Sequence, residues 1–166
     1  MKKSTRELLL QSAYSTLLNS GSKKTTIKEI AKNAGVNHGL VHHYFSSKED
    51  LLTAVLIDKN NAFCESISNL SENEDIEKVL NEFIIPNLIL LIEFTNLTSC
   101  MPKLQAELVQ RLKLTRSVIG KHYNINNEEN QKLLTAGMLG LLVHCRIDEG
   151  LSLNHYANQL IDLLNR

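Results

Sequence analysis

The segment from Asn37 to Tyr44, NHGLVHHY, gathers side chains that could do chemistry. Its histidines and its asparagine can donate or accept hydrogen bonds, and histidine can also bind a metal ion or move a proton. Gly39 adds no side chain, and Leu40 offers only apolar contact. Such a set suits a surface that reads hydrogen-bonding edges, a metal centre or a catalytic centre.

A metal centre and a catalytic centre are disfavoured by what the neighbouring residues lack. His38 and His42 could chelate Zn²⁺ from one helix face, but no cysteine or carboxylate beside them supplies a third ligand. His144 and Cys145 are the only adjacent base and nucleophile, and neighbours on a helix point about 100° apart. The sequence contains no G-x-S-x-G motif, no H-E-x-x-H motif and no phosphate loop. We therefore expect no metal, no cofactor and no enzyme activity.

The residues before this segment have the pattern of a helix-turn-helix. Apolar residues from Ile27 to Ala34 recur at helical spacing, and Thr26 is the expected N-cap. Ala31 is small enough to let a second helix pack closely, and Gly35 can adopt the positive φ that a tight turn requires. The second helix of such a pair enters the major groove of DNA.

In this arrangement the second helix would read bases, and the helix ends would hold phosphates. Helix N-termini offer free N–H groups to phosphate, and phosphate contacts position a protein without reading sequence. Tyr44 and Phe45 would mainly be core residues, although a tyrosine can bury its ring and present its hydroxyl to phosphate. We expect base contacts from Asn37, His38, Gly39, Leu40, His42 and His43, and phosphate contacts from Thr26, Lys28, Tyr44 and Lys48.

Residues 25–52, TTIKEIAKNAGVNHGLVHHYFSSKEDLL, resemble the N-terminal domain of the TetR family of bacterial transcriptional regulators. Ala13, Leu17 and Gly21 match the family's first helix and its end. The resemblance implies a homodimer whose C-terminal helical body binds a small molecule and then releases DNA. Leu40 and His42 stand where the family often has Ser or Thr and Tyr, so no operator sequence can be transferred.

Helical patterns without strand signals run through the rest of the chain, and we expect an all-α protein. Residues 1–47 would form a three-helix helix-turn-helix DNA-binding domain. Residues 48–166 would form a C-terminal helical bundle for dimerisation and ligand binding. The expected helices beside the helix-turn-helix cover residues 4–19 with Gly21 as C-cap, 48–70, 74–97 and 102–122, followed by a loop over 123–127 and two final helices near 133–143 and 152–165.

Charge is distributed unevenly although the formal net charge is zero. Residues 1–50 hold eight Lys or Arg against four Asp or Glu, which gives +4; residues 51–166 hold ten against fourteen, which gives −4. A basic N-terminal part fits a phosphate-binding module.

The cysteines and the apolar runs indicate a cytoplasmic protein. Cys64, Cys100 and Cys145 are odd in number, far apart and without metal-type spacing, as in a reducing compartment. The longest apolar run, residues 84–92, contains Pro86 and Asn87, so we expect no membrane span.

The last two helices have the composition of an interface. Leu133 to Val143, LLTAGMLGLLV, is apolar on every side and needs burial on two faces. Its glycines each cost about 1 kcal/mol in a helix, which close approach of another helix would explain. We expect a four-helix dimer interface built from Leu133, Gly137, Gly140, Leu141, Tyr156, Leu160 and Leu164. The alternative is a buried central helix in a monomer.

A small-molecule effector would bind among apolar and histidine side chains of the helical body. The candidate lining residues are Phe63, Phe83, Phe94, Met101, Leu108, His122, Met138 and His144. Apolar residues at helical spacing are core more often than pocket, and both interpretations stay open.

These patterns and the resemblance predict a TetR-like transcriptional regulator that binds a palindromic operator as a homodimer. Its partners would be double-stranded DNA, a second copy of the chain and a small-molecule effector. Repression is the family's common case. The alternative is a helical regulator that binds a partner protein and whose helix-turn-helix has lost DNA affinity.

Overall fold

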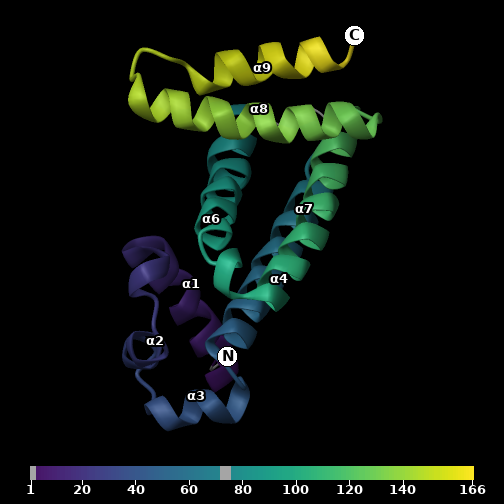
Figure 1. The fold of residues 1–166 in the computed structure, drawn as a ribbon. Coiled ribbons are helices and arrows are strands. Elements are labelled where there is room, and N and C mark those ends of the chain that lie inside the picture. Colours follow the sequence, from purple (N-terminus) through teal and green to yellow (C-terminus); the bar gives the residue numbers. More distant parts are fainter. Residues whose placement is uncertain (1–2, 72–75) are drawn as a thin grey trace. The chain divides into compact units, whose positions relative to one another are not determined.

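Helices make up the regular structure of the computed structural model, which describes residues 3–71 and 76–166. No strand occurs in these two ranges, and the all-α prediction is confirmed. In chain order (Figure 1), the elements are α1 (Thr5–Lys24), α2 (Ile27–Asn33), α3 (His38–Tyr44), α4 (Lys48–Ser68), α5 (Ile76–Val79), a π-helical turn (Leu80–Ile84), α6 (Ile85–Thr95), a 3-10 turn (Thr98–Cys100), α7 (Pro102–His122), α8 (Glu128–Ile147) and α9 (Leu153–Leu164).

The chain forms two compact units. The first unit comprises Met1–Asn60 and Ile89–Arg111, which include α1 to α3 with parts of α4, α6 and α7. The second comprises Asn61–Leu88 and Leu112–Arg166, which include α5, α8 and α9 with the remaining parts of those helices. The division expected between residues 47 and 48 follows chain order rather than these units, and it stays a prediction.

Buried polar side chains tie α1 to α2 in the first unit. Ser12 Oγ donates to the Ile30 carbonyl oxygen at 2.7 Å, and Thr16 Oγ1 donates to the Ser12 carbonyl oxygen at 2.7 Å. Asn33 Nδ2 in turn donates to Thr16 Oγ1 at 3.0 Å. Leaving such buried hydroxyls unpaired would cost about 1–3 kcal/mol each. These hydrogen bonds therefore help to fix how the first two helices pack.

The end of α1 differs from the prediction. Gly21 has φ +72° and ψ 170°, so the helix is broken where the sequence pattern placed its C-cap. The chain then forms a further helical segment up to Lys24 instead of a loop. Thr25 Oγ1 donates to the Gly21 carbonyl oxygen at 2.8 Å and holds the end of this segment.

A π-helical turn joins α5 to α6 in the second unit. The Ile85 N–H donates to the Leu80 carbonyl oxygen, five residues back. Pro86 follows and has no N–H to donate, which favours a local departure from α-helical hydrogen bonding. The helix expected over 74–97 therefore contains one wide turn, and the expectation for residues 74 and 75 lies outside the described residues.

The segment Leu80–Cys100 is long and apolar enough to cross a membrane, with a mean hydropathy of 1.5. Core helices of soluble proteins meet the same criterion, and Leu88, Leu90, Leu91 and Phe94 are buried inside the protein. The expectation of no membrane span stays a prediction.

In the second unit, α8 and α9 lie side by side (Figure 1). A Cβ atom on Gly137 would lie 2.4 Å from Leu160 Cδ2, so the missing side chain makes room for α9. Asn130 Nδ2 on α8 donates to the Leu164 carbonyl oxygen at 2.9 Å, which holds the end of α9. The close approach predicted from Gly137 therefore occurs within one chain.

Candidate nucleic-acid interface

The turn between α2 and α3 has the hydrogen bonds of a Schellman motif. The Gly35 N–H donates to the Lys32 carbonyl oxygen at 3.1 Å, and the Val36 N–H donates to the Ala31 carbonyl oxygen at 3.0 Å. Gly35 has φ +67°, as the pattern predicted. No atom lies within 4 Å of a Cβ built on Gly35. The backbone conformation, and not lack of space, therefore calls for glycine here.

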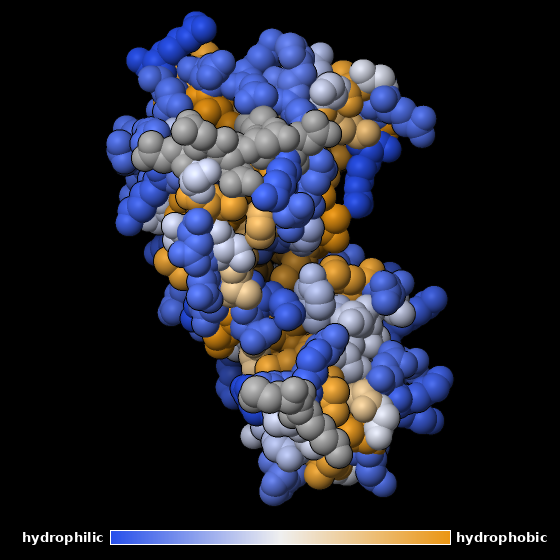
Figure 2. Space-filling view, turned by 180° about the vertical axis from the view of Figure 1, so that it is seen from behind, coloured by the Kyte–Doolittle hydropathy of each residue, from blue (hydrophilic) through white to orange (hydrophobic). Residues whose placement is uncertain are grey.

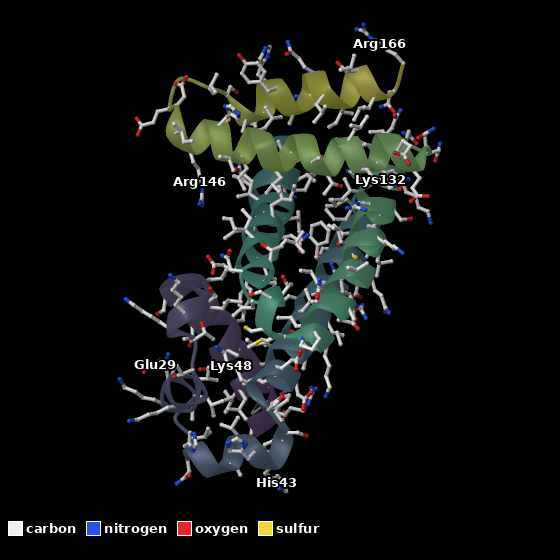
Figure 3. The ribbon with its side chains drawn as sticks, viewed as in Figure 1. Glu29, His43, Lys48, Lys132, Arg146 and Arg166 are labelled. Atoms are coloured by element: carbon white, nitrogen blue, oxygen red, sulfur yellow. The ribbon has the colours of Figure 1, made fainter. Side chains whose placement is uncertain are left out.

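α3 turns Val41 inward and its polar residues, together with Leu40, outward. Val41 is fully buried and Phe45, directly after the helix, is 6% exposed. The residues predicted to read bases are all exposed: Asn37, His38, Gly39, Leu40, His42 and His43. In Figure 3, His43 projects outward from α3. The exposed face from Asn37 to Tyr44 carries no carboxylate, so nothing on it repels phosphate.

Three of these side chains also make contacts within the helix-turn-helix. Asn37 Oδ1 accepts from the Gly39 N–H at 2.8 Å and caps α3, which leaves the Asn37 amide nitrogen as donor. The His38 and His42 rings lie edge to face with centroids 5.5 Å apart. Tyr44 is 39% exposed, so its predicted place in the core is wrong, while its exposure suits a contact with phosphate.

The predicted phosphate contacts lie at two helix starts. Thr26 Oγ1 accepts from the Glu29 N–H at 3.2 Å and caps α2, and Lys28 is exposed on the same helix. Ser47 Oγ accepts from the Asp50 N–H at 3.0 Å at the start of α4. Both helix starts therefore carry a hydroxyl cap, as the sequence predicted for Thr26, and N–H groups of the first turn that the cap does not use can bind phosphate.

Lys48 lies at the start of α4 (Figure 3) and is half-buried. It lines a cavity of about 740 Å³ together with Ser20, Gly21, Ser22, Lys23, Lys24, Glu93, Asn96, Leu97 and Cys100. Burial lowers the pKa of the Lys48 ammonium, while the nearby Cys100 opposes this change. A phosphate contact by Lys48 would therefore use a side chain that is only partly hydrated.

Glu49 and Asp50, in the first turn of α4, have partners on α7. Glu49 Oε1 accepts from the Lys103 N–H at 2.7 Å and from the Leu104 N–H at 3.3 Å. Asp50 Oδ1 lies 3.0 Å from Lys103 Nζ. The partners are more than fifty positions apart in sequence, and no short-range signal connects them.

The outer side of α8 carries an exposed apolar stripe. Leu133, Val143 and Ile147 are 56%, 46% and 81% exposed. Ala136 and Gly140 lie between them at steps of three or four residues, so the five residues share one helix face. A Cβ built on Gly140 meets no atom within 4 Å. The stripe includes two of the predicted interface residues and adds three that helical spacing could have revealed.

On α9, Tyr156 and Leu163 are 38% and 63% exposed. Leu141, Leu160 and Leu164, which were also assigned to the interface, are half-buried within the chain. Figure 2 shows hydrophobic residues at the surface among hydrophilic ones on the face that it draws. The dimer interface stays a prediction, and these exposed residues define the surface that it would use.

The predicted ligand-lining residues are divided between the two units. Phe94, Met101 and Leu108 are buried in the first unit, and Phe63 and Met138 are buried in the second. Phe83 and His122 are half-buried, and His144 is exposed. His122 borders a cavity of about 300 Å³ lined also by Ile67, Ser68, Leu70, Val118 and Lys121. The ligand pocket stays a prediction.

No group of three or more His, Cys, Asp or Glu side chains in residues 3–71 and 76–166 could hold a metal ion. The His38 and His42 rings form a pair without a third ligand.

Comparisons with known proteins agree with this geometry. Residues 9–55 match the family model of the bacterial regulatory proteins of the tetR family. The transcriptional repressor KstR2 of Mycolicibacterium smegmatis is 42% identical over 55 residues, which are 33% of this chain and 27% of that protein. The chain thus spans about a quarter of the length of the curated relatives that it matches.

Solved structures share the fold over nearly the whole chain. A transcriptional regulator from Rhodococcus sp. Rha1 has a TM-score of 0.77 at 20% identity, covering 97% of this chain and 96% of that one. The multidrug binding protein EbrR in complex with ethidium has a TM-score of 0.71 at 15% identity, covering 97% and 98%. These solved structures show the fold, and residues 9–55 form the helix-turn-helix domain that the tetR family model describes.

Proposed function

We propose that this protein is a DNA-binding transcriptional regulator that binds a palindromic operator as a homodimer in the cytoplasm. The observation that carries the proposal is the outward face of α3, where histidine and asparagine side chains are exposed without a carboxylate. These groups can donate or accept hydrogen bonds at base edges in the major groove. Leu40, 38% exposed, can contact a thymine methyl group.

Charge supports binding to a polyanion. The first fifty residues carry a formal charge of +4, from eight Lys or Arg less four Asp or Glu. Each phosphate neutralised by a cation releases counterions, so the affinity falls with added salt. A partner-protein regulator with an inactive helix-turn-helix is the competing function, and it would show no such salt dependence.

The exposed stripe on α8 supports a homodimer. An apolar surface with glycine and alanine at its centre lets a second helix approach closely. A dimer places two copies of α3 at a fixed separation. The two helix-turn-helix domains, called heads below, would enter successive major grooves if they lay about 34–36 Å apart. A bound operator is then unavailable to other proteins, which supports repression, and the relative KstR2 is itself a repressor.

A small-molecule effector would act by changing the separation of the two heads. The fold neighbour EbrR was solved in complex with ethidium, which supports the proposal of a small-molecule ligand for a protein of this fold. A change of a few ångströms in head separation would remove one head from its groove.

The decisive experiment is selection of bound sequences from random duplex DNA by the full-length protein. We expect enriched half-sites related by two-fold symmetry with centres 10–10.5 base pairs, or a multiple of that distance, apart. Absence of enrichment, together with binding to random DNA that does not depend on salt, would exclude the proposal and favour a protein partner.

The dimer is tested separately by light scattering. We expect the wild-type protein to give twice the 18.7 kDa chain mass, and Val143→Glu combined with Ile147→Glu to give monomers. Val109→Glu is the control because Val109 is an apolar residue of α7 that is 52% exposed and is not part of the stripe. A wild-type monomer, or a dimer unaffected by the double substitution, would contradict this interface.

A further inference from the structure

The first turn of α7 is capped by a carboxylate from another helix. α7 begins at Pro102, so the N–H groups of Lys103 and Leu104 belong to its first turn and have no intrahelical acceptor. Glu49 Oε1 accepts from both, at 2.7 Å and 3.3 Å. A negative charge at this end also complements the helix dipole.

An ion pair lies beside this cap. Asp50 Oδ1 is 3.0 Å from Lys103 Nζ. The hydrogen bond from Lys103 is the main cause that lowers the pKa of Asp50, and the same hydrogen bond raises the pKa of Lys103. Exposed ion pairs contribute little by themselves. The two backbone hydrogen bonds to Glu49 are therefore the stronger part of the contact.

The contact lies next to the residues proposed to bind DNA. Glu49 directly follows Lys48, and α3 ends five residues before Glu49, at Tyr44. Leu51, Leu52 and Leu104 are fully buried, so the chain on both sides of the contact is anchored in the core of the first unit. A carboxylate held at this point fixes the direction in which α4 leaves α3.

We propose that Glu49 is a positioning residue for DNA binding, which holds the start of α4, and with it Lys48 and α3, against the first turn of α7. This inference rests on the proposed function. It assigns to an acidic side chain a favourable effect on binding to an anionic ligand.

Simple electrostatics predicts the opposite sign. Glu49 is adjacent to Lys48, so removing its charge should attract phosphate and tighten binding to any DNA. Positioning predicts that removing the acceptor weakens binding to the operator, where both heads must fit. Glutamine separates the two effects because its amide oxygen still accepts hydrogen bonds while its charge is zero.

The experiment measures the affinity of full-length variants for two labelled duplexes, a palindrome from the selection and a random sequence, by fluorescence anisotropy. For Glu49→Ala we expect the ratio of palindrome to random affinity to fall about threefold to thirtyfold, as for loss of a helix cap. For Glu49→Gln we expect a ratio within about twofold of wild type, since one acceptor oxygen remains. Glu65→Ala is the control, because Glu65 is an exposed acid further along α4.

A smaller fraction of folded protein lowers both apparent affinities by the same factor and leaves their ratio unchanged. A destabilised variant therefore still tests the positioning role. An Ala variant with an unchanged or higher ratio would overturn the positioning role while leaving the proposed function intact. A Gln variant as poor as the Ala variant would also overturn it, because charge rather than hydrogen bonding would then be responsible. Failure of the wild-type protein to bind either duplex would overturn the proposed function and this inference together.

Discussion

Gly137 of α8 faces Leu160 of α9 so closely that a Cβ on the glycine would lie 2.4 Å from Leu160 Cδ2. We therefore expect Gly137→Val to force the two helices apart and to lower the free energy of unfolding by about 1–3 kcal/mol, as overpacked sites do. Urea denaturation followed by circular dichroism measures this change. A variant as stable as wild type would show that Leu160 can move aside without cost.

Gly140, one turn further along α8, provides the contrast. A Cβ there meets nothing within 4 Å in the chain. If no second copy of the chain contacts Gly140, Gly140→Ala should raise the free energy of unfolding by up to about 1 kcal/mol, because alanine has the higher helix propensity. If α8 of a second copy packs against this glycine, the same substitution should raise the dimer dissociation constant. Denaturation at several protein concentrations separates the two effects.

Tyr123 has a buried hydroxyl group without a hydrogen-bond partner among the described residues. Burying an unpaired hydroxyl costs about 1–3 kcal/mol, so Tyr123→Phe should raise the free energy of unfolding by about 1 kcal/mol. Tyr44→Phe is the control, because Tyr44 is 39% exposed and should change stability by less than about 0.5 kcal/mol. Equal effects of both substitutions would mean that burial of the hydroxyl is not the cause.

The same residue predicts a pH dependence. Burial raises the pKa of Tyr123 to about 12, whereas an unfolded chain ionises near 10. The free energy of unfolding is thus unaffected by this ionisation below pH 10. It falls as the pH rises from 10 through 12, because the unfolded chain loses the tyrosine proton first. Absorbance at 295 nm should show one tyrosine of the native protein titrating near pH 12, and Tyr123→Phe should remove that step.

His42 tests direct reading of bases. His42→Ala should weaken binding to the selected palindrome by about 1–3 kcal/mol, while random duplex is bound as before. Competition experiments with both duplexes measure the difference. Equal losses on both would assign His42 to phosphate instead.

Lys48 tests the phosphate contacts. Lys48→Ala should weaken binding to both duplexes alike and reduce the slope of log affinity against log salt by about one for each head. Lys59→Ala on the same helix is the control, because Lys59 lies over the Tyr14 ring and pairs with Asp58. A slope unchanged by the Lys48 substitution would mean that its half-buried ammonium does not reach phosphate.

The helix-turn-helix could be predicted from the sequence because its determinants are local. The positive φ of Gly35, the caps at Thr26 and Ser47 and the buried Val41 each follow from a residue type at a fixed short spacing. The exposure of Tyr44 was missed because Tyr44 and Phe45 are adjacent aromatic residues, and only one of them can face the core at the end of α3.

Contacts between distant segments could not be predicted in this way. Nothing near Glu49 in the sequence points to the N–H groups of Lys103 and Leu104. A glycine within an apolar helix indicates close approach but not the approaching helix, so Gly137 was assigned to a second subunit although Leu160 of its own chain packs there. The exposed stripe from Leu133 to Ile147, by contrast, could have been predicted, because its residues follow one another at steps of three or four in the sequence.

The turn at Gly35 has one more consequence. The backbone at Gly35 has a left-handed φ of +67°, and the space around the missing Cβ is empty. The chirality of a substituted residue, and not its size, therefore determines whether it fits. A D-alanine introduced there by chemical synthesis should fit without strain, whereas its L enantiomer, with the same atoms, should disturb the reading helix. The mirror image of an ordinary residue is therefore the natural substitute for this glycine.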